Sequence, residues 1–241
     1  MTGEFFRIER RGSVAELVLN RPERRNALVG PMIEQLTTLV GEISADDGIQ
    51  VVLFRGEGGA FCSGHDLKEL QAEPRPAWAN SLAAIFRAAN IALFECPKPI
   101  VGALERCAIN AGAALALSCD LLVAGETAFL QVGEIQQGAR IANNAAWLRL
   151  RAGEAVASRI ALLGERIAAA DLYRMGLVVE VVSDELVVGR AREMAARIAG
   201  FPDGSPARIK SDIRAQAQIG NATDWFREQS SQALLSAGRV S

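Results

Sequence analysis

The chain has 241 residues, half of them hydrophobic, and its 26 basic side chains nearly balance 28 acidic ones. This length and composition can bury a sizeable core as one domain with an appendage, and the balanced charge lacks the basic surface typical of nucleic-acid binding. A single histidine and four cysteines without a C-x-x-C pair argue against a structural zinc site. We therefore expect no metal, and reduced, mostly buried thiols in a cytoplasmic protein.

The first 50 residues predict a hairpin, a loop and a helix. Residues 5–9 and 14–19 are short, partly alternating apolar runs, which favour two paired strands. Pro22 then makes a loop, because proline cannot donate to a strand ladder. Pro31 fits the first turn of a helix whose apolar residues recur at helical spacing, and the turn at 46–48 ends that helix.

The middle of the chain repeats the order strand, loop, helix. Residues 51–54 indicate a buried strand, and a glycine-rich loop leads from it to a helix that begins at about Lys68. Two prolines make residues 73–77 a rim before a helix over 78–94. Two further buried strands are expected at 100–104 and 121–124. This order predicts an α/β domain.

Nothing in the sequence predicts a membrane span or a secretory signal. The longest apolar tract, residues 108–124, is interrupted by polar side chains, and the amino terminus has no cationic start followed by an apolar segment. We expect no membrane partner.

Beyond Glu134 the pattern is mostly helical. A segment dense in turn residues, 201–206, is the best boundary in the chain. It divides a core over 1–200 from a C-terminal helical region over 201–241. The helices expected on either side of this boundary cover residues 145–150, 156–163, 168–175, 186–198, 208–217 and 224–235.

The glycine-rich loop from Gly56 to Leu67 is the stretch with most chemical content. Its glycines leave backbone N–H groups unshielded by side chains, so the loop can hold a negative oxygen. It has neither the Gly-Lys-Ser/Thr of a phosphate loop nor the Gly-x-Gly-x-x-Gly of a dinucleotide site. From these residues alone, two interpretations stay open: a turn that stabilises an enolate-like oxyanion, and a purely structural strand-to-helix turn.

Four sequence blocks resemble the crotonase superfamily, specifically the enoyl-CoA hydratase/isomerase family. The glycine loop reads Gly-x-Gly-x-Ala-Phe-Cys-Ser-Gly-x-Asp-Leu and is similar to the first oxyanion motif of that family. The other three blocks match in order and spacing, at residues 20–28 (Asn-Arg-Pro-Glu-Arg-Arg-Asn-Ala-Leu), 110–120 and 164–178. The resemblance implies a spiral of β-β-α units with a C-terminal helical region, assembled as a homotrimer or a dimer of trimers.

The resemblance also implies the catalytic groups. The backbone amides of His65 and Ala111 would receive the thioester oxygen, although glycine is usual at the second position. Hydratases of the family have two glutamates, of which one falls on Glu134 and the other on Ala114, which cannot titrate. Only one candidate acid/base residue is left.

The substrate implied is an acyl-CoA thioester, so coenzyme A arrives with the substrate and no separate cofactor is expected. Arg24, Arg25 and Lys68 are the candidates to meet its phosphates, and the backbone from His65 to Lys68 would line its pantetheine and adenine end. The full set of expected substrate contacts is Arg24, Arg25, Ala27, His65, Asp66, Leu67, Lys68 and Ala111.

A single glutamate favours double-bond isomerisation, because one base can remove a proton and return it at another carbon. The alternatives are an enoyl-CoA hydratase with reduced acid/base machinery and a catalytically silent acyl-CoA-binding homologue. The side chain of His65 is a second candidate for acid/base work, whereas Cys62 and Ser63 lack the Gly-x-Ser-x-Gly elbow of acyl-enzyme chemistry.

The segment after Gly138 departs from the family's usual Pro-Gly-Gly-like turn. Its polar residues are Arg140, Asn143 and Asn144. They can place polar groups near the acyl chain, which would suggest an unusual substrate. Alternatively, one of the asparagines caps the helix expected from about residue 145.

Overall fold

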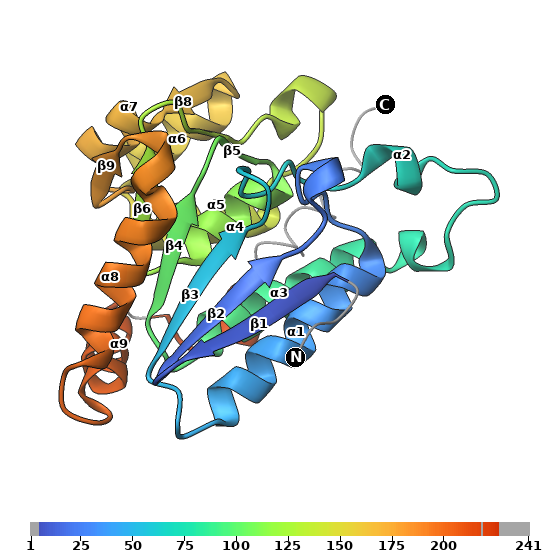
Figure 1. Ribbon diagram of the computed structural model, residues 1–241. Helices are drawn as coiled ribbons and strands as arrows, with labels where there is room; N and C mark the ends of the chain where they lie inside the picture. The colour runs from blue at the N-terminus through green and yellow to red at the C-terminus, as the bar shows by residue number, and fades with distance from the viewer. Residues whose placement is uncertain (1–4, 218, 227–241) are drawn as a thin grey trace.

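A computed structural model describes residues 5–217 and 219–226. Its centre is a six-stranded sheet of order β1-β2-β3-β4-β6-β9, in which β1 and β2 are antiparallel and all other pairs are parallel. The predicted hairpin and α/β class are confirmed (Figure 1). The strands are β1 Phe6–Arg11, β2 Val14–Leu19, β3 Val51–Gly56, β4 Ile100–Leu104, β6 Leu121–Gly125 and β9 Glu180–Val182.

A three-stranded sheet beside the first contains β5 (Cys107–Ile109), β7 (Phe129–Gln131) and β8 (Arg166–Ala168). Twice the chain passes from a strand of the large sheet to a strand of the small sheet and then to a helix: β4, β5 and α4 (Ala111–Ser118), then β6, β7 and, after the 3₁₀ turn η3 (Glu134–Gln137), α5 (Ala142–Arg151). These are the β-β-α units that the resemblance implied.

The short strands were not predicted. The helix expected over 168–175 is wrong at its start, because Ala168 ends β8 and α7 spans Ala169–Arg174. A three-residue strand offers too few positions for its alternation to be seen in sequence.

Helices cover both faces of the large sheet. α1 (Gly30–Ala45) and α3 (Leu82–Glu95) lie on one side, and α8 (Val187–Ala199) packs on β3, β4 and β6 from the other (Figure 1). Alternate residues of β3 therefore enter two cores: Val52 and Phe54 the larger one, Val51 and Leu53 the one under α8. Burial on both faces explains why these strands are continuous apolar runs.

The C-terminal segment packs against the core through α9 (Ser205–Gln216). Lys210 and Arg214 of this helix form ion pairs with Asp120 at 2.8 and 3.2 Å. Residues 222–226 are helical, and the rest of the helix expected over 224–235 lies outside the described residues. The boundary at residue 200 stays a prediction. The remaining elements are η1 Pro22–Arg24, α2 Leu67–Leu70, η2 Ala77–Asn80, α6 Glu154–Leu163, η4 Asp184–Leu186 and α9 Ser205–Gln216.

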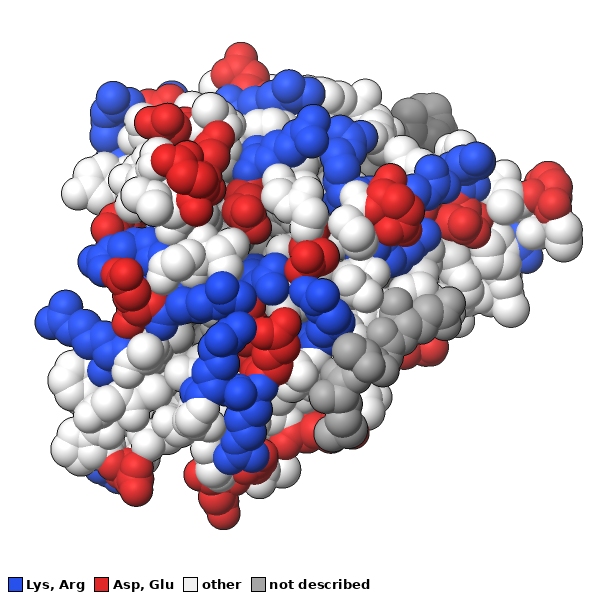
Figure 2. Space-filling view, viewed as in Figure 1, with Lys and Arg blue, Asp and Glu red and all other residues white. Residues whose placement is uncertain are grey.

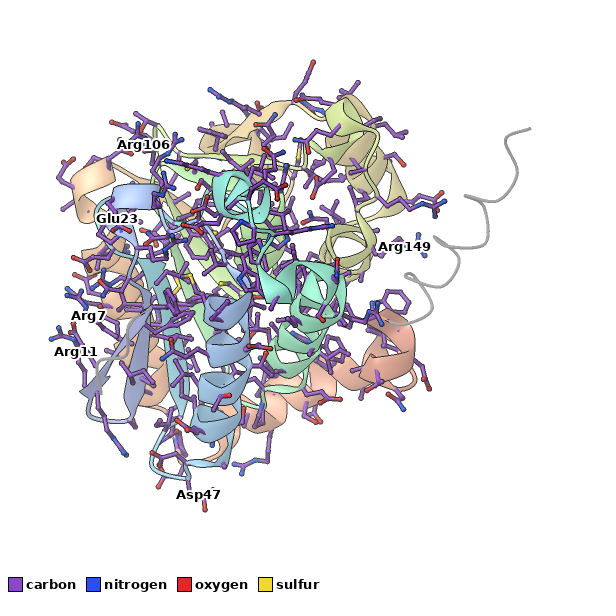
Figure 3. All side chains as sticks on the ribbon, turned by 90° about the vertical axis from the view of Figure 1, so that its right-hand side faces the viewer. Arg7, Arg11, Glu23, Asp47, Arg106 and Arg149 are labelled. Atoms are coloured by element: carbon purple, nitrogen blue, oxygen red, sulfur yellow. The ribbon has the colours of Figure 1, made fainter. Side chains whose placement is uncertain are left out.

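The loops that follow the parallel strands gather at one end of the molecule. Figure 3 shows Glu23, after β2, and Arg106, after β4, at the same end, whereas Asp47, before β3, lies at the opposite end. Ligands of open parallel sheets bind at the carboxyl ends of the strands. The glycine loop, which follows β3, and the segment that leads into α4 both lie at this end.

The surface seen in Figure 2 carries basic and acidic side chains side by side rather than a field of one sign. Within the described residues, no helix is both long and apolar enough to cross a membrane.

Candidate active site

The glycine loop is held in place by the Arg-Pro block, chiefly through Asn26. This side chain is fully buried, and its Nδ2 donates to the carbonyl oxygens of Glu57 at 3.0 Å and Ala60 at 2.7 Å. Its Oδ1 accepts from the amide of Arg21 at 2.9 Å. A Cβ on Gly56 would lie 1.9 Å from the Ala60 carbonyl oxygen, so only glycine fits there. Sequence reasoning quoted Asn26 in a motif but gave it no role.

The backbone at His65 faces away from the Arg-Pro block. Gly64 O accepts from Leu28 N at 2.8 Å and Asp66 N donates to Leu28 O at 2.9 Å, so the amide of His65, between them, is directed to the other side. The segment before α4 lies close to the glycine loop: a Cβ on Gly64 would lie 2.8 Å from Ile109 O. The two small-residue segments are therefore in contact.

Ala111 is the first residue of α4, and its position is set by Asn110. Asn110 has φ +52°, a left-handed conformation that is costly for a residue with a Cβ. Four hydrogen bonds hold it there. Its amide donates to Gln131 O at 2.8 Å and its Oδ1 accepts from Gly133 N at 2.9 Å, while its carbonyl oxygen accepts from Asn144 Nδ2 at 3.0 Å and from Ala114 N at 3.2 Å. Such strain persists only where the surroundings enforce it.

The two predicted amides take no part in the hydrogen bonding of the described part of the chain. Within residues 5–217 and 219–226, neither His65 N nor Ala111 N donates to an acceptor. For Ala111 this follows from its place in the first turn of a helix, where N–H groups have no intrahelical acceptor and favour a negative group.

Glu134 is the first residue of η3, which follows β7, and it is partly buried. Its Oε1 accepts from Asn144 Nδ2 at 2.9 Å, whereas its Oε2 is buried without a partner in the described part of the chain. Burial raises the pKa of this carboxyl, and hydrogen bonds from its own backbone amide and from Asn144 partly oppose that rise. One oxygen of a carboxylate with a raised pKa is thus left unengaged.

The side chain of His65 is set in an apolar environment. Its ring lies 5.1 Å from that of Phe86, edge to face, and its Nδ1 is buried without a partner among the described residues. Burial lowers its pKa to about 4, so the imidazole is neutral at physiological pH.

Helix α4 carries no titratable group where a hydratase would have its first glutamate. Ala114 is fully buried, as is every other residue of this helix. The helix expected after Gly138 begins earlier than predicted, at Ala142, with Ile141 as its N-cap and no side-chain cap. The expectation that Asn143 or Asn144 caps it is therefore wrong, and Asn144 instead joins Glu134 to Asn110.

The expected coenzyme A contacts are distributed along η1 and α2. Asp66 is buried, caps α2 by accepting from Glu69 N at 3.2 Å, and pairs with Arg21 at 3.2 Å and Arg24 at 3.5 Å. Arg25, Leu67 and Lys68 are exposed and Ala27 is buried. Among the described residues, no three acidic, histidine or cysteine side chains lie together as metal ligands. All four cysteines are free and buried, as predicted.

Comparisons with known proteins identify the family of this chain. A family model described as enoyl-CoA hydratase/isomerase matches residues 9–236. The chain is 32% identical to the 1,2-epoxyphenylacetyl-CoA isomerase of Escherichia coli over 84% of this chain and 79% of that protein. It is 30% identical to the 2,3-dehydroadipyl-CoA hydratase of the same organism, over 95% and 89%.

Among solved structures, a monofunctional enoyl-CoA isomerase from M. smegmatis aligns with a TM-score of 0.75 and 27% identity, covering 90% of this chain and 96% of that one. Because the family model spans nearly the whole chain and several relatives reach 30% identity along most of it, this protein belongs to the enoyl-CoA hydratase/isomerase family and is an enzyme of that kind.

Proposed function

We propose that this enzyme moves the double bond of a 3-enoyl-CoA to position 2, with Glu134 as its single acid/base residue. The observation that carries the proposal is that only one of the two positions that hold glutamates in hydratases of the family has a carboxyl group here. Glu134 is partly buried with one oxygen unengaged, and the place of the second glutamate is taken by the buried methyl group of Ala114.

The chemistry needs one base and one oxyanion site. Glu134 removes a proton from C2 of the thioester, and the electron pair moves onto the carbonyl oxygen to give a dienolate. The amides of His65 and Ala111 hold that oxygen, and each such donor is worth about 3 kcal/mol of barrier in well-studied hydrolases. Glu134 then returns the proton to C4, which leaves the double bond between C2 and C3 and regenerates the carboxylate.

The electrostatics of Glu134 support a shuttling role. Burial raises its pKa, which brings the protonated and deprotonated forms closer in free energy near neutral pH. A base that must also act as an acid within one turnover benefits from that balance.

Hydration of a 2-enoyl-CoA is the second candidate. It is supported by the names of relatives such as the 2,3-dehydroadipyl-CoA hydratase, and it would use Glu134 with reduced acid/base machinery. Ala114 argues against efficient hydration, because water activation in this family uses two carboxylates. The third candidate is a protein that binds acyl-CoA without catalysis, which the absence of a carboxyl group at Ala114 also favours.

For coenzyme A, Arg25 and Lys68 are the cations to which we assign phosphate contacts, since neither has an ion pair within the described residues. Arg24 shares its charge with Asp66 and contributes less. Ala27, Asp66 and Leu67 contribute to the walls around them.

We also infer a homotrimer or dimer of trimers that works in the cytoplasm. The apolar side chains of Phe201, Ile209 and Ile213 are more than half exposed at 51, 59 and 67% around α9, and an interface between subunits would bury them. Light scattering of the full chain measures the assembly.

The deciding experiment compares a 3-enoyl-CoA with the matched 2-enoyl-CoA, with binding of each followed by calorimetry. Isomerisation of the first without hydration of the second supports the proposal. Hydration of the second selects the hydratase candidate. Binding of both without turnover leaves only the silent reading, and no binding at all would contradict all three.

A further inference from the structure

Asn144 joins the two parts of the proposed site. It lies in the first turn of α5 and only 3% of it is exposed. Its Nδ2 donates to Glu134 Oε1 at 2.9 Å and to the carbonyl oxygen of Asn110 at 3.0 Å. Asn110 directly precedes Ala111, whose amide is one of the two proposed oxyanion donors. A single buried amide group therefore contacts both the base and the turn that sets the donor.

The orientation of this amide follows from its partners. Both groups within 3.0 Å are acceptors, a carboxylate and a backbone carbonyl, so the NH₂ group must face them. Both of its hydrogens are then used. Its oxygen, Oδ1, points elsewhere and is buried without a partner among the described residues.

The same contact distinguishes the two oxygens of Glu134. Oε1 accepts a hydrogen bond from a group that can only donate, so it remains an acceptor in both protonation states. Oε2 has no such partner within the described residues and is the oxygen on which a proton can reside.

We infer that Asn144 is a positioning residue of this enzyme: it fixes the Glu134 carboxylate relative to the turn before Ala111 and assigns proton transfer to Oε2. This rests on the proposed function of Glu134 as the acid/base residue. The residue lies in the segment after Gly138 that the sequence singles out by its polar side chains.

The test is the pH dependence of two variants. Asn144→Ala removes a donor that stabilises the charged form of Glu134, so the acid limb of the kcat profile should move up by about one pH unit. Asn144→Asp places a second carboxyl beside the first and should move that limb further in the same direction. In both, kcat at neutral pH should fall much more than KM rises.

Asn143→Ala is the matched control. Asn143 is the neighbouring asparagine in the same turn of α5, and no hydrogen bond joins its side chain to Glu134. Its acid limb should stay within about 0.2 pH units of the parent, well inside the shift expected from losing a charge-assisted bond. Circular dichroism and thermal melting of every variant separate folding defects from titration shifts.

A second readout does not need turnover. Infrared difference titration of the parent against Glu134→Gln reports the ionisation of Glu134 directly, and the same measurement in the Asn144 variants should show it moving upward. If the pKa of Glu134 rises in the Asn144 variants but the parent turns over no enoyl-CoA, the inference about Asn144 stands and the proposed reaction is wrong. If folded Asn144→Ala and Asn144→Asp show no shift larger than that of Asn143→Ala in either readout, the inference about Asn144 is wrong.

Discussion

Glu16 and Glu134 are two carboxylates with opposite surroundings. Glu16, on β2, is fully buried, and three arginines donate to it: Arg55 at 2.6 Å, Arg192 through Nη2 and Nε at 2.6 and 2.9 Å, and Arg11 at 3.1 Å. These cations outweigh the effect of burial and lower its pKa to about 2.

Glu134, by contrast, has only neutral donors among the described residues, its own backbone amide and Asn144, and a raised pKa. A buried carboxylate that is saturated by cations joins strands to a helix, whereas one that is left short of partners is available for proton transfer. The comparison separates a structural carboxylate from a chemical one by the number and charge of its hydrogen-bond donors.

The largest effect should follow from Glu134→Gln. Because a positioned acid/base group contributes about 10² to 10⁴ in rate, turnover of a 3-enoyl-CoA should fall by that factor while the melting temperature changes little. Steady-state kinetics and thermal melting measure the two. Glu126→Gln, at an exposed position, serves as control. Undiminished turnover in Glu134→Gln would remove this residue from the mechanism.

Glu16→Gln should have the opposite effect to Glu134→Gln: the free energy of unfolding should fall, whereas turnover by the folded protein should be unchanged. Removing the charge leaves Arg55 buried with the part-exposed Glu57, at 3.0 Å, as its remaining counter-ion, and breaking a buried pair costs up to about 3 to 5 kcal/mol. Urea unfolding measures the cost. Glu9→Gln is the matched control, since Glu9 lies directly opposite Glu16 in the β1–β2 ladder but is partly exposed and should cost under about 1 kcal/mol. Equal costs for the two variants would contradict this prediction.

Acid should weaken the fold through Glu16. Its pKa in the folded chain lies below its ordinary value of 4.5, so the unfolded chain binds the proton first. The stability that Glu16 supplies is complete above pH 4.5 and is lost as the pH falls towards 2, by about 3 kcal/mol in all. Comparing the free energy of unfolding of the parent with that of Glu16→Gln between pH 6 and 3 isolates the contribution of Glu16. Parallel curves for the two proteins would contradict the prediction.

The smallest effect should come from His65→Ala. The proposed role of this position lies in its backbone amide, which the variant keeps, so the loss of turnover should be well under the roughly 100-fold that removal of an oxyanion donor costs. A neutral imidazole packed on Phe86 gives no reason for more. A loss of that size in folded protein would instead make the side chain catalytic.

Sequence predicted the parts of the fold that are long and regular. The six-residue strands β2 and β3 and the helix α1 have enough positions for their periodicity to be visible. The three-residue strands of the small sheet do not, and the helix expected at 168 was misplaced for that reason.

In the site, the motif positions of His65, Ala111 and Glu134 were available from sequence, and their roles stay predictions. The contact between Asn144 and Asn110 was not available, since it joins residues 34 apart. Sequence favoured a helix cap at Asn143 or Asn144 because asparagine has that local preference, and at Asn144 tertiary contacts prevailed over it. The Glu16–Arg55 pair was hidden as well, because each charge stands alone in an otherwise apolar run.

Helix α5 contacts both ends of α4. Asn144 reaches the carbonyl just before α4 begins, and the guanidinium of Arg151 donates to the carbonyl oxygens of Cys119 and Asp120 just after it ends. The aligned peptide dipoles of α4 therefore have a permanent cation at their negative pole, and the proposed reaction places an anionic oxygen at their positive pole. One helix thus contacts both ends of another, and a change that slides α5 along its axis should disturb the electrostatic field at the proposed oxyanion site.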